Sequence, residues 1–184
     1  MIERNKLGMI LFLLSESVFF LLLILAYAFY HTSGELGTKA AHALNVIQSG
    51  IFSVALFSSS FTLWQADRCL KDGERARVRF WLAATVGLGL IFLVGQGIEY
   101  ARLLRDQITI SRNLFGTTFF TLTGFHGLHV AVGLALLMIL FGLSARKNGS
   151  EPSPVAMGSI SLYWHFVDGV WVVIFSIVYL WGFI

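Results

Sequence analysis

The sequence predicts an all-α integral membrane protein, a bundle of five transmembrane helices that forms a single domain over residues 1–184. Of the 184 residues, 57% are hydrophobic and 12% are charged, a composition too apolar for a water-soluble domain. The apolar residues form long runs, and about 20 such residues span a bilayer. Because the basic residues gather in short segments between these runs, the net charge of +3 indicates membrane flanks rather than nucleic-acid binding.

Five apolar runs are long enough to cross a membrane. The predicted spans are residues 7–30, 43–64, 80–104, 115–143 and 159–184. The polar segments between them are short, and none is large enough to form a domain of its own. We therefore expect one compact bundle with short connections.

The first span contains Glu16 in its middle, and it is too long for the core of a secretory signal peptide. We therefore expect a retained transmembrane helix. Glu16 has two readings: a carboxylic acid that hydrogen-bonds a neighbouring helix, or a proton-responsive site. The position of the residue in the span favours neither reading.

The second and third spans carry small residues that allow helices to approach closely in lipid. In the second span these residues are mainly hydroxylated: Ser49, Ser53, Ser58, Ser59, Ser60 and Thr62. In the third they are Gly87, Gly89, Gly95 and Gly97. Gln96, Glu99 and Arg102 follow one face of the third span, where Glu99 and Arg102 can pair at a spacing of three. We expect these three residues at a lipid or subunit interface.

The fourth and fifth spans each place ionisable groups among apolar residues. His126 and His129 share a face of the fourth span, and His165 and Asp168 share a face of the fifth. Together with Glu16 they could form a polar layer, in which a carboxylate contact fixes a histidine tautomer. Structural hydrogen bonding is favoured over direct chemistry. Trp164 and Trp171 flank this group, and we expect them at a lipid or subunit interface.

The basic residues predict that the N-terminus is cytoplasmic and the C-terminus is outside. In this orientation the outside segments hold Lys39, Arg102, Arg105 and Arg112. The inside segments hold more: Arg4, Lys6, Arg68, Lys71, Arg75, Arg77, Arg79, Arg146 and Lys147.

Several ordered motifs resemble subunit III of the haem–copper oxidases, a family that includes cytochrome c oxidase and bacterial quinol oxidases. The most specific are residues 123–130 (TGFHGLHV) and 163–168 (YWHFVD). Residues 11–16 (LFLLSE), 58–62 (SSSFT) and 95–100 (GQGIEY) resemble the same family in the same order. The resemblance runs nearly end to end and matches a short, five-helix bacterial form.

The resemblance implies a subunit without redox centres, so no metal or cofactor is expected in this chain. It would pack beside catalytic subunit I in the bacterial inner membrane, in a complex that also contains subunit II. The haem and copper of the complex are expected in these partner subunits. The complex would reduce oxygen to water and pump protons. This chain would stabilise subunit I, bind phospholipid and support proton uptake, with Glu16 at the family's membrane-embedded carboxylate. Two N-terminal helices of longer relatives are missing, and residues 158–161 (GSIS) replace a carboxylate that many relatives carry.

Other assignments remain open from the residues. A relative associated with nitric oxide reductase belongs to the same family. A stand-alone b-type cytochrome would use His126 and His165 as axial ligands, and a small transporter could use Glu16 and Asp168 as coupling sites.

Overall fold

Five long α-helices make up most of the molecule. The computed structural model describes residues 4–33, 44–111, 114–145 and 153–181. The α-helices are α1 (Arg4–Thr32), α3 (Val46–Lys71), α4 (Arg75–Arg105), α5 (Leu114–Ala145) and α6 (Pro154–Phe175), and a π-helical turn, η1 (Ser176–Leu180), continues α6. All five are long and apolar enough to cross a membrane. Within the described residues, the predicted all-α class and the presence of five helices able to span a membrane are therefore confirmed.

Several helices extend beyond the predicted spans into polar sequence. The α3 helix continues to Lys71 and α4 begins at Arg75, because a helix needs backbone hydrogen bonds but not apolar side chains. Residue 43, residues 182–184 and four of the basic residues used to predict orientation (Lys39, Arg112, Arg146 and Lys147) lie outside the described part of the chain.

Local sequence sets where two of the helices begin. The side chain of Asn45 accepts a hydrogen bond from the Gln48 amide at 3.0 Å and caps α3. Ser153 caps α6 in the same way, accepting from the Ala156 amide at 3.1 Å, and Pro154 occupies the first turn. Both arrangements satisfy amide groups that have no partner within the helix.

The connection between α3 and α4 is a tight turn that depends on a glycine. Gly73 has a φ of +75°, a left-handed conformation that costs glycine little. The amide of Glu74 bonds the Cys69 carbonyl at 2.9 Å and the amide of Gly73 bonds the Leu70 carbonyl at 3.2 Å, which together close α3 in a Schellman motif. The turn folds α4 back along α3.

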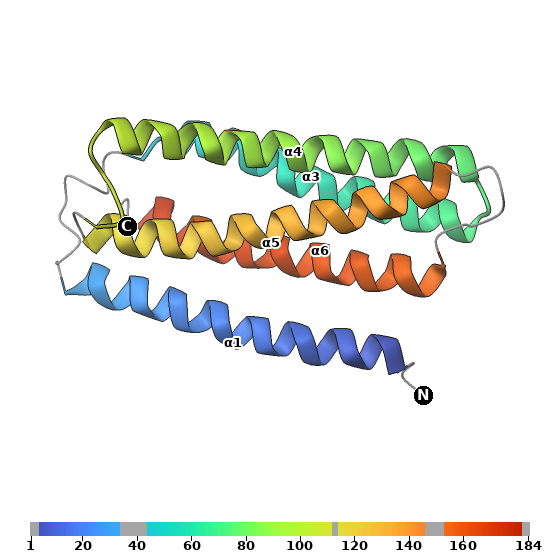
Figure 1. Ribbon diagram of the computed structural model, residues 1–184, viewed down its shortest axis with the longest axis horizontal. Helices are drawn as coiled ribbons and strands as arrows, with labels where there is room; N and C mark the ends of the chain where they lie inside the picture. Colours follow the sequence, from blue (N-terminus) through green and yellow to red (C-terminus); the bar gives the residue numbers. More distant parts are fainter. Residues whose placement is uncertain (1–3, 34–43, 112–113, 146–152, 182–184) are drawn as a thin grey trace.

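The helices lie side by side along one long axis (Figure 1). The α3 and α4 helices form a closely packed pair, and α5 and α6 lie against it. The α1 helix lies on the far side of α5 and α6 and packs mainly against these two. Side chains of α1, α5 and α6 can therefore contact one another in one layer of the bundle. Side chains of α3 and α6 meet in a second layer.

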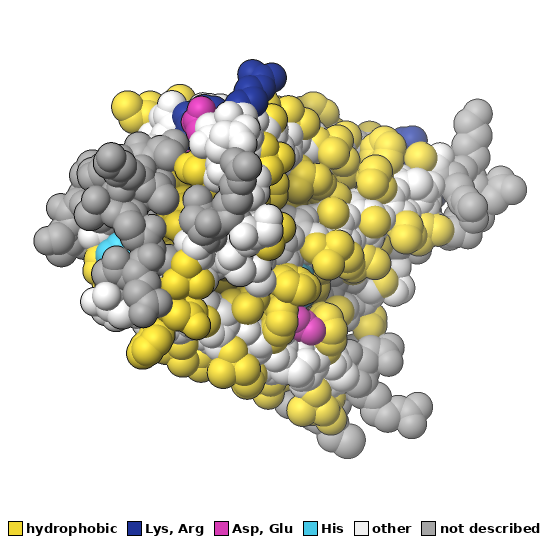
Figure 2. Space-filling model, turned by 60° about the vertical axis from the view of Figure 1, so that its left-hand side comes forward, with side chains coloured by type: hydrophobic (Ala, Val, Ile, Leu, Met, Phe, Trp, Pro, Cys, Tyr) yellow, Lys and Arg dark blue, Asp and Glu magenta, His cyan; other side chains and the backbone are white. Residues whose placement is uncertain are grey.

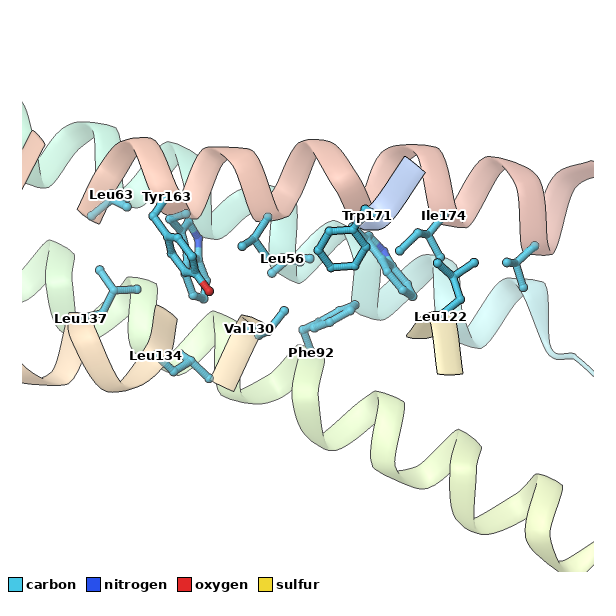
Figure 3. Close-up of a cluster of buried hydrophobic side chains, with 14 of the residues drawn as sticks. Leu56, Leu63, Phe92, Leu122, Val130, Leu134, Leu137, Tyr163, Trp171 and Ile174 are labelled. Carbon is cyan, nitrogen blue, oxygen red and sulfur yellow. The ribbon is translucent and has the colours of Figure 1, made fainter. Parts of the chain in front are cut away.

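Large apolar and aromatic side chains from α3, α4, α5 and α6 fill the centre of the bundle. Figure 3 shows Phe92 of α4 beside Trp171 of α6, with Leu56 of α3 and Val130 of α5 nearby. Hydrophobic side chains also predominate along the outer face seen in Figure 2. On α1, Leu14, Leu22 and Phe29 are between 58% and 66% exposed, as expected for a helix that faces lipid or another membrane protein.

Candidate functional site

Glu16 of α1 and His129 of α5 form a contact across the two helices. The carboxylate Oε2 of Glu16 lies 3.1 Å from Nε2 of His129. The side chains are only 21% and 14% exposed, so the pair sits just below the surface of the bundle. The structure therefore brings together two members of the predicted polar layer that are 113 residues apart in sequence.

The other ring nitrogen of His129 determines how this contact is protonated. Its Nδ1 lies 2.7 Å from the backbone carbonyl of Phe125, and a carbonyl oxygen can only accept a hydrogen bond. We therefore assign a proton to Nδ1. The hydrogen bond between Nε2 and Glu16 then needs one further proton, carried either by the imidazole or by the carboxyl group.

Aromatic residues surround the Glu16–His129 pair and fix the histidine. The ring of Phe20 meets His129 edge-on at 4.9 Å, and Phe19 meets Phe125 in the same way at 5.0 Å. The Tyr163 hydroxyl donates to the His129 carbonyl at 3.0 Å. These contacts hold α1, α5 and α6 together at the level of the pair.

Asp168 and His165 of α6 meet through a residue of α3. The Ser60 hydroxyl donates to Oδ2 of Asp168, and Nδ1 of His165 lies 3.0 Å from the same hydroxyl oxygen. With Ser60 donating to the carboxylate, His165 is the donor to Ser60. Asp168 is buried at 7% exposure, whereas His165 is exposed, so the chain of three residues runs from the surface into the bundle.

His126 is separate from both of these groups. It is fully buried, its ring stacks on Trp171 at 4.8 Å, and Phe92 meets it edge-on. Among the described residues, no hydrogen-bond partner lies near either ring nitrogen. The five residues of the predicted polar layer therefore occupy three places: the Glu16–His129 pair, the Asp168–Ser60–His165 chain, and His126 in the aromatic core.

Trp164 and Trp171 lie inside the bundle rather than at the lipid or subunit interface where they were expected. Their exposures are 1% and 2%. Each indole N–H donates to a serine of α3, Trp164 to Ser59 at 2.9 Å and Trp171 to Ser53 at 2.8 Å. Because serine supplies the partner that a buried indole needs, the ring can be fully enclosed.

Two glycines make the space for the Trp164 ring. A Cβ atom at Gly133 would lie 2.7 Å from Cε3 of Trp164, and one at Gly89 would lie 3.0 Å from its Cη2. The first distance is shorter than a side chain tolerates, and at the second the ring would have to shift. The ring therefore lies between the bare backbones of α4 and α5.

Glu99 and Gln96 are also buried in the bundle. Oε2 of Glu99 accepts from the Ser49 hydroxyl at 2.8 Å and from the Tyr179 hydroxyl at 2.6 Å. The predicted pairing with Arg102 is present at 3.7 Å, between Nη2 and Oε1, and Arg102 is the more exposed partner. Gln96 donates from Nε2 to the Thr123 carbonyl at 2.8 Å. These residues connect α3, α4, α5 and η1.

Sequence reasoning did not assign the hydroxyl groups that complete these contacts. The missed residues are Ser49, Ser53, Ser59, Ser60, Tyr163 and Tyr179. The serines were identified as close-packing residues, and their repeated placement along one span was the available signal. Tyr163 opens the motif at residues 163–168, whereas for Tyr179 the sequence offers no comparable signal.

Possible metal ligands are scattered in the part of the chain that the structure describes. No group of three or more histidine, cysteine, aspartate or glutamate side chains there lies close enough to hold a metal ion. His126 and His165 also have different surroundings, one in the aromatic core and the other exposed beside Ser60.

Comparison with known proteins gives a consistent result over almost the whole chain. The family described as "Cytochrome c oxidase subunit III" matches residues 2–183. The chain is 37% identical to cytochrome c oxidase subunit 3 of Synechocystis over 97% of its own length and 76% of that relative. It is 39% identical to the Corynebacterium diphtheriae protein of the same name, over 94% of this chain and 85% of the relative. The chain therefore belongs to the cytochrome c oxidase subunit III family.

Proposed function

We propose that this chain is the non-catalytic third subunit of a haem–copper terminal oxidase that reduces oxygen to water and pumps protons. The observation that carries the proposal is the family match, which extends from residue 2 to residue 183. In this role the chain packs directly against subunit I, in a complex with subunit II, and stabilises subunit I. The haem and copper centres belong to those partner subunits.

We further propose that the Glu16–His129 pair supports proton uptake by the complex. The Nε2 atom of His129 and the Oε2 atom of Glu16 lie 3.1 Å apart, and both side chains are slightly exposed. A proton can therefore reach the pair from a neighbouring subunit or a lipid headgroup without unfolding of the bundle. The exposed apolar side chains of α1 supply a face for phospholipid or for a partner helix.

We place the N-terminus in the cytoplasm, the C-terminus outside, and the protein in a bacterial inner membrane. Lys71 and Arg75 flank the turn between α3 and α4, where both side chains are exposed. Nearby, the Arg68 guanidinium lies 4.8 Å from the centre of the Trp64 ring. Basic residues beside an interfacial tryptophan are typical of a cytoplasmic membrane flank.

The first test is purification of the tagged chain from its native membrane in mild detergent. Co-purification of subunits I and II with oxygen reductase activity is the expected result. A nitric oxide reductase as partner would keep the family and change the reaction. A chain that purifies alone with its own haem spectrum would contradict the proposal.

The proton-uptake role is tested by the substitution Glu16→Ala in the assembled complex. It should lower the number of protons pumped per electron or shorten the working life of the enzyme, because His129 loses the partner with which it shares a proton. Ser15→Ala is the matched control, since the Ser15 hydroxyl bonds only the Phe12 carbonyl of its own helix. Pumping, turnover and lifetime equal to wild type in the Glu16 variant would refute this role.

A further inference from the structure

A small cavity lies inside the bundle beside Glu99. Its volume is about 10 Å³, close to the smallest that holds one water molecule. The polar side chains around it are Ser49, Gln96 and Glu99, and the apolar ones are Phe52, Phe92 and Trp171. The cavity thus joins α3, α4 and α6 and has polar groups on one side.

The Glu99 carboxylate is only half satisfied by the protein. Its Oε2 accepts two hydrogen bonds, from Ser49 and Tyr179. Among the described residues, no donor lies within hydrogen-bond distance of Oε1, and the Arg102 nitrogen at 3.7 Å is beyond that distance. Because Glu99 is only 5% exposed, bulk solvent does not compensate for this oxygen.

The side-chain oxygen of Gln96, Oε1, is a second buried acceptor without a hydrogen bond from the described residues. Its amide nitrogen donates a hydrogen bond to the Thr123 carbonyl and a weaker one, at 3.3 Å, to the Tyr100 hydroxyl. Its Oε1 has no hydrogen-bond partner in the described part of the chain. Gln96 and Glu99 are three residues apart on α4 and both line the cavity, so the two unpaired oxygens belong to neighbouring positions on one helix face.

The indole and hydroxyl donors nearby are already engaged, and the Arg102 guanidinium forms an ion pair with Oε1 of Glu99 at a distance too long for a hydrogen bond. The Trp171 indole lines the cavity, but its N–H donates to Ser53. The Ser49 and Tyr179 hydroxyls donate to the other oxygen of Glu99. The unpaired groups are both acceptors, so the missing ligand has to be a donor, and the cavity limits it to one small molecule.

We propose that this cavity is a binding site for one ordered water molecule, which donates to Oε1 of Glu99 and to Oε1 of Gln96. A buried carboxylate oxygen without a partner is costly, whereas a bound water satisfies two acceptors at a small entropic cost. The water would be an internal part of the bundle, linking α4 to the contacts that Ser49 and Tyr179 make from α3 and η1. This proposal does not depend on the role of the chain in an oxidase.

The test is a density map of the chain in lipid nanodiscs, with its native subunits, at a resolution that shows ordered water. The expected result is one peak within about 2.6–3.2 Å of both Oε1 atoms. A map that resolves Ser49, Gln96, Glu99 and Tyr179 and shows other buried waters, but no peak here, would overturn the proposal. So would a peak with four or more oxygen neighbours at metal–ligand distances that changes when sodium is exchanged for potassium.

The substitution Glu99→Gln tests the chemistry of the site with little change of shape. Ser49 and Tyr179 orient the new carbonyl oxygen, so the amide nitrogen takes the place of Oε1 and no longer needs a donor. The water can no longer donate to both groups and has to accept from the new amide, so the peak should weaken or shift from its wild-type position. Ser58→Ala is the control: it removes an exposed hydroxyl of α3 that does not line the cavity, and the peak should remain. An unchanged peak in Glu99→Gln would contradict the assignment.

The wild-type protein supplies an independent measurement if the variant does not assemble. Infrared spectra in ordinary and ¹⁸O-labelled water should differ by the shifted O–H stretch of a weakly exchanging internal water. Its absence, in a sample whose other buried waters give the shift, would overturn the proposal.

Discussion

Hydroxyl groups of α3 satisfy several of the polar groups that the neighbouring helices bury. Ser59 and Ser53 accept from the Trp164 and Trp171 indoles, and Ser60 donates to Asp168. A buried donor or acceptor without a partner costs more than the net gain from a formed hydrogen bond. The stability of the α3–α6 contact therefore depends on the identity of individual serines.

Replacing Ser59 by alanine should destabilise the bundle by about 1–2 kcal/mol, since the buried indole N–H of Trp164 loses its acceptor. Ser58→Ala provides the matched control, because Ser58 is the adjacent residue and is exposed. The free energy of unfolding in mixed detergent micelles measures both. Equal stability of the two variants would show that this hydrogen bond contributes little.

The polar residues show what sequence spacing can and cannot predict. His126 and His129 share a face of α5, as a spacing of three predicts, yet the first is fully buried and the second is 14% exposed. Three residues turn a helix by about 300°, so neighbours on one face still differ by about 60° in direction. Which helix each one meets depends on the packing of the whole bundle, and spacing alone does not define it.

Among the helices, hydropathy predicted existence and approximate position well and predicted the ends poorly. The predicted span 43–64 corresponds to α3, which begins at Val46 and ends at Lys71. Hydropathy reports which residues tolerate lipid, whereas the helix end is determined by the Gly73 turn and its backbone hydrogen bonds. The π-helical turn after Phe175 has no signature in the apolar pattern and could not be predicted.

Two glycines of α4 provide a test of helix packing. A Cβ at Gly95 would lie 2.2 Å from Cγ of Phe52 on α3, whereas nothing lies within 4 Å of a Cβ at Gly97. Gly95→Ala should therefore cost about 1–3 kcal/mol through overpacking. Gly97→Ala should be neutral or stabilising by up to about 1 kcal/mol, because alanine favours the helix.

Thermal unfolding of the two purified glycine variants in the same detergent distinguishes these effects. The melting temperature should fall for Gly95→Ala and stay level or rise for Gly97→Ala. Similar shifts in both variants would show that α3 and α4 are not as closely packed as described.

On the scale of the whole molecule, the bundle divides into the α3–α4 pair, the central α5 and α6, and the outer α1 (Figure 1). Sequence predicted the five helices and their order but not this grouping, because hydropathy carries no information about which helices touch. The turn at residues 72–74 comes before α4, and the segment at residues 106–111 comes after it. The two segments therefore lie at opposite ends of this helix. These two segments must therefore lie on opposite sides of a membrane that α4 crosses.

The proposed orientation can be measured with cysteine labelling. In a Cys69→Ala background, Asp72→Cys should react with an impermeant thiol reagent only in inside-out vesicles, because the positive-inside rule places this turn in the cytoplasm. Asp106→Cys should react only in right-side-out vesicles. Both positions are exposed. The reverse pattern would invert the topology without changing the fold.

The position of α1 also has a consequence for how the chain is made. Translation at about 5–20 residues per second leaves roughly 6–23 s between synthesis of Glu16 and of His129, which lies 113 residues later. During this interval the first helix is in the bilayer with an acidic group that has no protein partner. Insertion of α5 ends that interval, so a ribosome that stalls before α5 leaves a first helix whose carboxyl group has not yet met His129.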